Sequence, residues 1–319
     1  MKKNLSLADY ISGIKNKDLS ILARAITLVE SMNVQHRQLA NELIKNILPL
    51  TGKARRVGIS GTPGVGKSTF LENFGLDLIN QNNSLAILAI DPTSQLTGGS
   101  ILGDKTRMAK LSAHRNAFIR PSPNGKTLGG VAAKTREAML LCDAFGFDYI
   151  FIETVGVGQS EISVSKVVDM FILLMQPGGG DELQGIKRGI LEVSDLVIIN
   201  KADGEHASLA KIAQHDYKKS LEVLQENRQW QTKVLRCSSL KKEGFKDIKK
   251  SIDTYFDQYD KSKRQAQFKS WIEDLLVEKF SYQLAKVSNF DEKVNAILAG
   301  KNDLLTSVDD IYKEVISYD

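Results

Sequence analysis

The segment Val57–Thr69 constrains this chain more than any other part of the sequence. It reads Val-Gly-Ile-Ser-Gly-Thr-Pro-Gly-Val-Gly-Lys-Ser-Thr, and its part from Gly61 to Ser68 fits G-x-x-x-x-G-K-[ST], the pattern of a phosphate-binding P-loop. Glycines let the backbone turn tightly and aim its N–H groups at phosphate oxygens, and the following helix adds its positive end. Lys67 can neutralise the β- and γ-phosphates, and the Ser68 hydroxyl can bind Mg²⁺. The predicted nucleotide-binding residues here are Gly61, Thr62, Pro63, Gly64, Val65, Gly66, Lys67, Ser68 and Thr69.

The flanking patterns decide between a nucleotide site and a glycine-rich turn that binds nothing. Val57–Ser60 has the character of a short buried strand. Ser68–Leu78 is helical, because its large apolar residues recur on one face: Phe70, Leu71, Phe74 and Leu78. A strand directly before the glycines and a helix directly after them is the setting that a P-loop requires. The sequence therefore predicts a nucleotide site.

Strand and helix patterns alternate from residue 55 to about residue 258, which is typical of a parallel sheet with helices on both faces. Several predicted strands are near-continuous apolar runs, as strands buried on both faces should be. The predicted strands are Val57–Ser60, Leu85–Ile90, Ala117–Arg120, Tyr149–Glu153, Val168–Met175, Asp195–Asn200 and Thr232–Cys237. The predicted fold is an α/β P-loop NTPase with a mostly parallel central sheet, flanked by N-terminal and C-terminal helices.

Helical patterns occupy both ends of the chain. Asp18–Glu30 and Gln35–Leu48 precede the P-loop, whereas Ser262–Lys286 and a piece beginning near Asn302 follow the last strand. The apolar stripe of the C-terminal helices either packs on the P-loop domain or forms a subunit interface. The predicted organisation is an N-terminal helical extension, a P-loop domain and a C-terminal helical segment that serves dimerisation, at residues 1–52, 53–258 and 259–319.

The composition is that of a soluble globular protein, with 42% of the 319 residues hydrophobic and 25% charged. No apolar run reaches the roughly eighteen residues of a membrane span, and no secretory signal is present, so no membrane partner is expected. The net charge of +5 is spread over helical patterns, which favours solvated helix faces over nucleic-acid binding. The densest basic group is Lys241, Lys242, Lys246, Lys249 and Lys250. Two cysteines suit a cytoplasmic protein, and no Cys or His pair has metal-ligand spacing.

The tetrapeptide Asn200-Lys201-Ala202-Asp203 follows an apolar strand and matches N-K-x-D, the guanine-reading motif of G proteins. The Asp203 carboxylate can accept hydrogen bonds from N1–H and the exocyclic amine of guanine, a donor pair that adenine lacks. The Lys201 stem can lie across the base, and Asn200 can brace the loop. After the last predicted strand, a backbone N–H of Ser238, Ser239 or Leu240 can meet the guanine O6. The predicted ligands are therefore GTP and GDP.

The strand Tyr149–Glu153 ends in Glu153-Thr154-Val155-Gly156, which reads as D-x-x-G with Glu in place of Asp. Glu153 is placed to hold Mg²⁺ through water, and the Gly156 N–H is placed to sense the γ-phosphate. Val157 stands where Ras-like proteins keep the glutamine that orients the attacking water, so we expect slow intrinsic hydrolysis. Gln159 is the nearest substitute, or else a plain polar loop residue.

Two further acids are candidate Mg²⁺ partners because this ion prefers oxygen ligands. Asp91 ends the second predicted strand, and Asp104 follows a glycine-containing loop. Asp104 could instead only begin the helix that runs through Met108.

A glycine triplet at residues 178–180 begins the charged segment that ends at Arg188. Its residues Asp181, Gln184 and Lys187 could share one face of a following turn, and Glu182 lies between them. Such a loop has the character of a switch or partner-binding element, although an ordinary connection between a strand and a helix would fit as well.

Together these segments resemble the methylmalonyl-CoA mutase-associated GTPase family, of MeaB type, also labelled ArgK or lysine/arginine/ornithine transport-system kinase. The resemblance covers about residues 55–240 and rests on the P-loop, Asn200–Asp203 and five further stretches. These are Asp-Pro-Thr-Ser (91–94), Gly-Gly-Ser-Ile-Leu-Gly-Asp-Lys-Thr-Arg-Met (98–108), Phe-Ile-Arg-Pro-Ser-Pro (118–123), Glu-Thr-Val-Gly-Val-Gly-Gln-Ser-Glu (153–161) and Gly-Asp-Glu-Leu-Gln-Gly-Ile-Lys (180–187). Ser238-Ser239 departs from the usual Ser-Ala pair.

This resemblance implies a homodimeric P-loop G protein of the SIMIBI class. It implies a chaperone that binds an adenosylcobalamin-dependent acyl-CoA mutase and couples GTP hydrolysis to cofactor loading and protection of the mutase. The Mg²⁺ roles of the family carry over onto Ser68, Asp91, Asp104 and Glu153, and the switch and partner roles onto Asp181, Glu182, Gln184 and Lys187. The candidate catalytic residues are Lys67, Glu153, Gln159 and Lys187.

Three other functions compete with this one. A metallochaperone GTPase for nickel enzymes shares the SIMIBI scaffold but would need Cys or His ligands near the switches. A kinase of a basic-amino-acid transport system, as the old family label suggests, would need a phosphoacceptor pocket. A nucleotide-dependent scaffold without enzymatic turnover would fit Val157.

Overall fold

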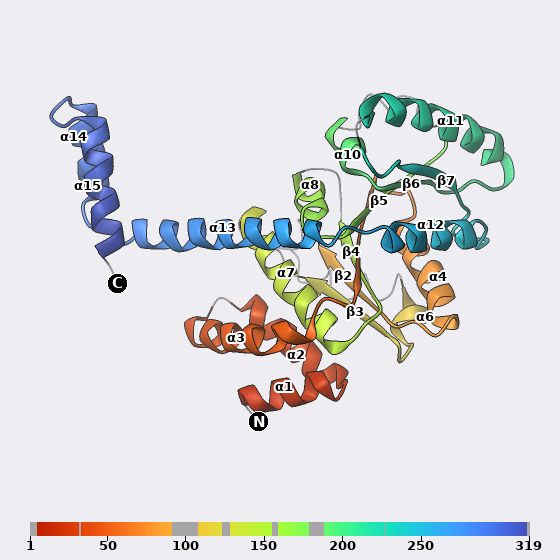
Figure 1. Cartoon of the computed structure of the whole chain (residues 1–319), viewed down its shortest axis with the longest axis horizontal. Helices are drawn as coiled ribbons and strands as arrows, with labels where there is room; N and C mark the ends of the chain where they lie inside the picture. The colour runs from red at the N-terminus through yellow and green to blue at the C-terminus, as the bar shows by residue number, and fades with distance from the viewer. Residues whose placement is uncertain are drawn as a thin grey trace. The chain divides into compact units, whose positions relative to one another are not determined.

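The computed structural model describes residues 5–31, 33–90, 108–122, 128–154, 159–178, 188–226 and 228–317. The chain divides into two compact units, Met1–Lys261 and Ser262–Asp319 (Figure 1). The first unit holds the P-loop, the central sheet and the N-terminal helices, and the second unit is helical. Each unit is described by itself below.

Seven strands of the described chain form one sheet in the order β3-β2-β4-β1-β5-β6-β7. All of their pairings are parallel. The strands are β1 Arg55–Gly61, β2 Leu85–Ile90, β3 Ala117–Ser122, β4 Tyr149–Thr154, β5 Met170–Met175, β6 Leu196–Ile199 and β7 Lys233–Arg236. Each of the seven predicted strands is present, within two residues at either end. The predicted parallel sheet is therefore confirmed.

Helices cover this sheet, and those that lie between strands carry the chain from one strand to the next (Figure 1). They are α4 Lys67–Asn80, α6 Ala109–Ser112, α7 Leu128–Phe145, α8 Gln159–Ser165, α10 Arg188–Val193, α11 Ala207–Leu224 and α12 Phe245–Asp257, with a 3-10 turn at Gly204–His206. Parallel strands need such crossovers because consecutive strands must begin at the same end of the sheet. All carboxyl ends of the strands consequently lie along one edge, which is where the P-loop follows β1.

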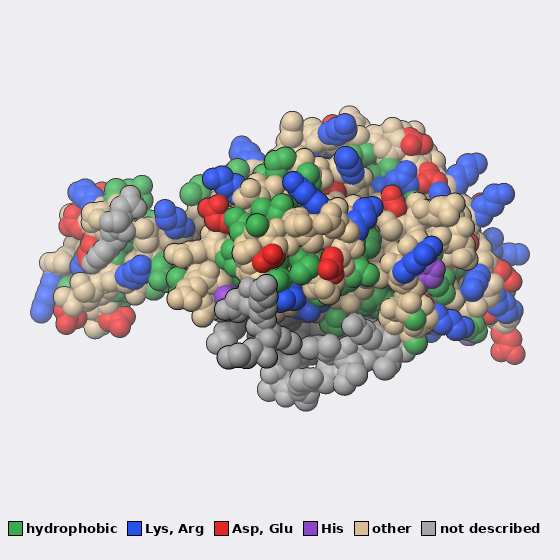
Figure 2. Space-filling view, turned by 90° about the horizontal axis from the view of Figure 1, so that it is seen from below, with side chains coloured by type: hydrophobic (Ala, Val, Ile, Leu, Met, Phe, Trp, Pro, Cys, Tyr) green, Lys and Arg blue, Asp and Glu red, His purple; other side chains and the backbone are tan. Residues whose placement is uncertain are grey.

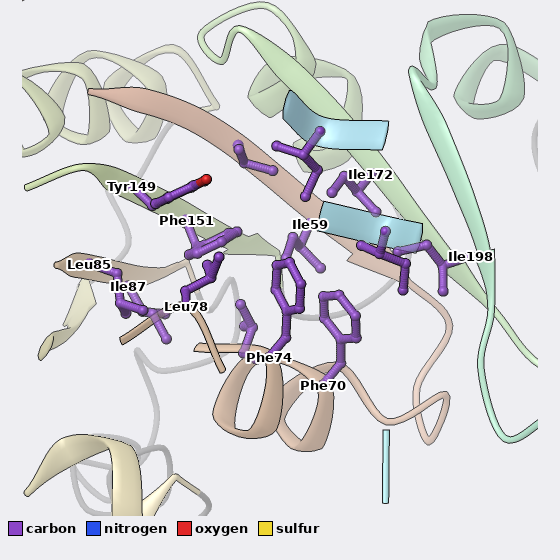
Figure 3. Close-up of a cluster of buried hydrophobic side chains, with 14 of the residues drawn as sticks. Ile59, Phe70, Phe74, Leu78, Leu85, Ile87, Tyr149, Phe151, Ile172 and Ile198 are labelled. Atoms are coloured by element: carbon purple, nitrogen blue, oxygen red, sulfur yellow. The ribbon is translucent and has the colours of Figure 1, made fainter. Parts of the chain in front are cut away.

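One cluster of buried hydrophobic side chains packs the helix after the P-loop against the sheet (Figure 3). Phe70 and Phe74 lie one turn apart on α4, stack with ring centroids 5.1 Å apart, and point at Ile59 and Phe151 of the sheet. All four side chains are fully buried, and each large buried side chain contributes roughly 1.5–3 kcal/mol to folding. The aromatic spacing that predicted the helix therefore also fixes where its N-terminus meets β1.

Three N-terminal helices, α1 Leu7–Lys15, α2 Leu19–Glu30 and α3 Val34–Ile47, pack on α7 (Figure 1). Two buried acids on α7 secure this layer. Glu137 forms an ion pair with Arg37, and Asp143 accepts hydrogen bonds from the backbone N–H groups of residues 52–54 at 2.8–3.1 Å. The two predicted N-terminal helices are confirmed, whereas the short α1 was not predicted.

The second unit contains α13 Ser262–Leu284, α14 Phe290–Leu298 and α15 Leu304–Ser317. Helices α13 and α15 agree with the predicted pieces, and α14 was not predicted. Its core is small: Val287, Ile311 and Val315 are buried, with Leu284 packed against them. Large apolar side chains on its surface are Ile272, Leu276, Val277, Phe280, Tyr282, Phe290, Val294, Leu298, Leu304, Leu305, Val308, Tyr312 and Ile316. This unit buries little of its apolar surface by itself.

Figure 2 shows one face of the molecule, on which Lys and Arg side chains are dispersed among acidic and apolar ones. The exposed lysines of α12 belong to a helix whose apolar residues Phe245, Ile248 and Ile252 face the core. On α12 the basic residues therefore form the solvent side of an amphipathic helix, as the sequence predicts.

A buried ion pair at the amino ends of the strands holds β1, the start of β5 and the end of α12 together. Asp169 is fully buried and accepts hydrogen bonds from Arg56 Nε at 3.0 Å and Tyr259 Oη at 2.9 Å. The backbone N–H of Arg56 donates to the same carboxylate at 3.1 Å.

We predict that Asp169→Ala lowers the free energy of unfolding by about 3–5 kcal/mol, because it removes the carboxylate that balances the buried charge of the Arg56 guanidinium. Urea unfolding followed by circular dichroism measures this change. The control is Asp77→Ala, which removes a half-buried acid of α4 that accepts a hydrogen bond from Gln81 and should cost less than about 0.5 kcal/mol. A loss below about 1 kcal/mol for Asp169→Ala would contradict this account.

Candidate functional site

The P-loop joins the carboxyl end of β1 to the N-terminus of α4, as the sequence predicts. Two of its glycines are required by their surroundings. A Cβ on Gly61 would lie 2.3 Å from the carbonyl oxygen of Leu174 on the neighbouring β5, so the strand and the loop approach each other too closely for a side chain. Gly66 caps α4 with φ +97°, a left-handed conformation that glycine adopts readily. The loop is therefore shaped by the sheet on one side and by the helix on the other.

Lys67, the first residue of α4, extends back over the loop. Its Nζ donates hydrogen bonds to the carbonyl oxygens of Gly61 at 2.6 Å and Thr62 at 3.2 Å. The ammonium group therefore lies beside the N-terminus of a fourteen-residue helix, where two sources of positive charge add. The Thr62 hydroxyl is buried and has no hydrogen-bond partner within the described part of the chain. This combination suits a loop that receives phosphate oxygens.

Ser68 and Glu153 are brought together although 85 residues separate them. The Ser68 hydroxyl donates a hydrogen bond of 3.3 Å to a carboxylate oxygen of Glu153, which is buried at the end of β4. This contact follows from the register, because Glu153 lies opposite Ile59 of β1 and the P-loop begins two residues later. A hydroxyl and a carboxylate are hard oxygen donors of the kind that Mg²⁺ prefers. These two residues therefore fit the predicted ion.

The side-chain amide of Asn200 bridges two loops. Asn200 follows β6 and is buried, and its Nδ2 donates to the carbonyl oxygen of Val65 in the P-loop at 2.8 Å. Its Oδ1 accepts hydrogen bonds from Ser239 N at 3.0 Å, Ser239 Oγ at 2.7 Å and the Cys237 thiol at 3.3 Å. The N-K-x-D loop, the turn after β7 and the P-loop thus form one hydrogen-bonded assembly.

Lys201 and Asp203 are solvent-accessible residues of the N-K-x-D loop in this assembly. Lys201 has φ +56° and its Nζ donates to Gln176 Oε1 at 3.3 Å, while the backbone N–H of Ala202 binds the Cys237 carbonyl at 2.9 Å. The side chain of Asp203 is 22% exposed, and one of its carboxylate oxygens lies 3.6 Å from Lys241 Nζ. Asp203 therefore keeps a side that a ligand can reach.

The turn after β7 holds the three residues predicted to supply an N–H to the base. The Ser238 N–H binds the Glu243 carbonyl at 3.2 Å, and the Ser239 N–H is taken by Asn200, as described above. Leu240 is 76% exposed. The turn closes through Gly244, where φ is +82° and a Cβ would lie 2.4 Å from the Arg236 carbonyl oxygen.

Sequence reasoning did not assign Lys241 to the site, because it belongs to the densest group of lysines and such groups usually face solvent. Its pairing with Asp203 depends on the turn geometry, since thirty-eight residues separate them in the chain. The signal that could have found it is its place directly after the predicted base-reading residues.

Both cysteines are buried and protonated. Burial raises the pKa of the Cys142 thiol, and burial likewise raises the pKa of the Cys237 thiol to about 12. Neither thiol is therefore a thiolate ligand at neutral pH. Within the described ranges, His, Cys, Asp and Glu form no group of three or more that could hold a metal ion.

Several predicted site residues lie outside the described residues. They are Asp91, Asp104, Gly156, Val157, Asp181, Glu182, Gln184 and Lys187, and the side chain of Gln159 also lies outside them. Their predicted roles in Mg²⁺ binding, switching and catalysis stay predictions.

Comparison with known proteins identifies the family. Residues 22–289 match the family model described as "Methylmalonyl Co-A mutase-associated GTPase MeaB". The chain belongs to this family. The match includes the P-loop, Asn200–Asp203 and the helices α3 and α13, so the predictions of the family and of a GTPase are confirmed.

Individual relatives agree with the family match. The "GTPase ArgK" of Escherichia coli is 44% identical over 313 residues, which is 96% of this chain and 95% of the relative. The "Methylmalonic aciduria type A homolog, mitochondrial" of mouse is 46% identical over 283 residues, which is 84% of this chain and 68% of the relative. Among solved structures, a "LAO/AO transport system kinase" has a TM-score of 0.75 and 34% identity, with 98% of both chains covered.

These matches confirm the predicted P-loop NTPase fold. The nickel complex of HypB from Helicobacter pylori, at a TM-score of 0.50 and 20% identity over 69% of this chain and 94% of that one, shows a likeness of fold alone. No described helix of this chain is long and apolar enough to cross a membrane.

We predict that Asp203→Asn changes the nucleotide preference of the protein from GTP to xanthosine triphosphate. Guanine presents its N1–H and 2-amino donors to a carboxylate, whereas xanthine carries an oxygen at C2 that the Asn amide can bind. The variant should bind GTP at least about 100-fold more weakly and bind xanthosine triphosphate more tightly than the wild type. Competition against a fluorescent nucleotide measures both affinities, with Asp247→Asn at an exposed position of α12 as control. A variant that still prefers GTP would refute the role of Asp203.

Proposed function

We propose that this GTPase is a G-protein chaperone of an adenosylcobalamin-dependent acyl-CoA mutase, and that it couples GTP hydrolysis to cofactor loading and to protection of the mutase. The observation that carries this proposal is the family match, which spans residues 22–289 of the chain. The mitochondrial relatives named for methylmalonic aciduria support a link to the same metabolic enzyme. We expect this chain to work in the cytoplasm.

The site supports a slow nucleotide switch. Lys67 and the N-terminus of α4 hold and neutralise phosphates, while Asn200 and Asp203 orient the base in the same hydrogen-bonded assembly. Ser68 and Glu153 would hold Mg²⁺, which supplies charge stabilisation to the phosphates when bound. The Val157 position favours a low intrinsic rate. A switch of this kind acts through a partner protein that binds differently to its GTP and GDP states.

The central test is GTP turnover in the presence of the mutase. We predict that an adenosylcobalamin-dependent acyl-CoA mutase from the same cell binds this protein and raises its GTP turnover at least about tenfold, because the partner completes a site that is slow alone. Phosphate release measures turnover, and ATP serves as the control nucleotide. Lys67→Ala should abolish turnover with and without the mutase.

A mutase that neither binds nor changes the rate would overturn the chaperone proposal and leave the GTPase intact. Transfer of the γ-phosphate to a transport-system protein would favour the kinase alternative instead. Both outcomes are read in the same assay, since released phosphate and labelled protein are distinguished directly.

We further propose that the second unit forms a homodimer interface. Its three helices bury only a few residues, while Leu276 on α13 and Leu305 on α15 are 61% and 74% exposed. An exposed apolar surface of this extent around so small a core is typical of a subunit interface. A second copy of the chain presents the same surface and can cover it symmetrically.

We predict that the double variant Leu276→Asp and Leu305→Asp is monomeric, whereas the wild type is a dimer, because two buried carboxylates in an apolar interface are strongly unfavourable. Light scattering after gel filtration measures the mass of each. Val223→Asp, at an exposed apolar position of α11 in the first unit, is the matched control and should remain dimeric. A monomeric wild type would instead point to packing of the stripe within one chain.

A further inference from the structure

Asn73 is a polar residue of α4 that reaches beyond its own helix. It lies on the helix that begins at Lys67, and its Nδ2 donates a hydrogen bond of 3.0 Å to the carbonyl oxygen of Ser239. The two residues are 166 positions apart, and the acceptor lies in the turn after β7 that the sequence predicts to read the base. The helix that receives phosphate is thus tied directly to the turn that would meet guanine.

This contact completes the fixation of Ser239. Asn200 Oδ1 accepts from both the N–H and the hydroxyl of Ser239, and Asn73 donates to its carbonyl, so the buried residue is held on both sides of its Cα. The hydroxyl contact exists because this chain carries Ser where the resemblance leads one to expect Ala. The Ser239 hydroxyl donates to Asn200 Oδ1, and the other end of the amide, Nδ2, donates to the P-loop carbonyl of Val65.

Holding the Ser239 carbonyl also aims the next N–H. The carbonyl of Ser239 and the N–H of Leu240 belong to one planar peptide unit, and the described chain has no cis peptide bond, so the two groups point in opposite directions. Of the three N–H groups of residues 238–240, that of Leu240 donates no hydrogen bond within the described part of the chain, whereas the other two bind Glu243 and Asn200. Asn73 therefore sets the direction of the available donor.

We propose that Asn73 is a positioning residue for guanine recognition, acting through the Ser239–Leu240 peptide to aim the Leu240 N–H at the O6 edge of the base. This inference rests on the proposed guanine site formed by Asn200 and Asp203. It predicts that loss of the Asn73 amide weakens contact with the base and leaves the phosphate contacts of the P-loop unchanged.

The test compares GDP, ADP, 6-thio-GDP and pyrophosphate on the full-length protein. Each Kd is obtained by competition with a fluorescent GDP analogue, whose own Kd is measured for every variant. Asn73→Ala should bind GDP about three- to tenfold more weakly, the effect of one lost neutral hydrogen bond, and pyrophosphate within about twofold of wild type. The loss should be smaller for 6-thio-GDP, because sulfur is a weak acceptor and gains little from an aimed N–H.

The matched control is Asn80→Ala, which makes the same substitution at an exposed position of α4 and should change none of the affinities. Ala is the residue most favourable in a helix, so both variants should fold. Asn73→Asp is the second variant: it keeps the shape of the side chain but places an oxygen against the Ser239 carbonyl, and it should weaken GDP binding at least as much.

Three results would overturn the proposal. GDP affinity of Asn73→Ala within twofold of wild type would show that the contact does not matter for binding. An equal loss for pyrophosphate would place the damage in the P-loop, and an equal loss for 6-thio-GDP would place it away from O6. A wild type that binds ADP as tightly as GDP would reject the guanine site itself, which separates that failure from a failure of Asn73 alone.

Discussion

The hydrogen bonds of the Asn200 amide are the interaction on which the site depends most. Its two ends contact the P-loop at Val65 and the turn at Ser239, which approach each other only in the folded sheet. A short amide can span this gap because β1, β5 and β6 are adjacent and parallel, so the loops after β1 and β6 leave the same edge. Since a buried amide that loses a partner costs about 1–3 kcal/mol, displacement of either loop is opposed by the other.

The position of the Asn200 amide gives a second reason for a glycine at residue 66. Gly66 caps α4 in a left-handed conformation, which alone would favour glycine. A Cβ at this position would also lie 2.7 Å from Asn200 Nδ2, closer than real Cβ contacts allow. The P-loop pattern explains Gly66 by phosphate binding, and the close approach of Asn200 independently favours glycine at this position. The same glycine therefore links the P-loop to the loop that the sequence predicts to read the base.

The sequence predicted those parts of the structure that depend on local pattern. The apolar runs located all seven strands, and the spacing of Phe70 and Phe74 located α4. The parts it could not predict are set by tertiary packing. The likeness of residues 153–156 to D-x-x-G predicted that Glu153 serves the nucleotide site, but no pattern in residues 149–154 encodes the strand order and register that bring it beside the P-loop. Asn73 gave no signal either, because a single amide on a half-buried helix has no periodicity.

The helices that were not predicted show the same limit. Helix α14 has nine residues and buries none of them, so it carries only part of an amphipathic pattern. Helix α1 also has nine residues, with only Tyr10 and Ile14 buried, and depends on a capping box at Ser6. Short helices of this kind are stabilised by caps and neighbours more than by propensity. For α1 the neighbours are α2, α3 and α7; for α14 the described contact is with α15, whose own apolar surface remains largely exposed. Among the described residues, the second unit therefore leaves far more of its large apolar side chains exposed, relative to its buried core, than the first unit does.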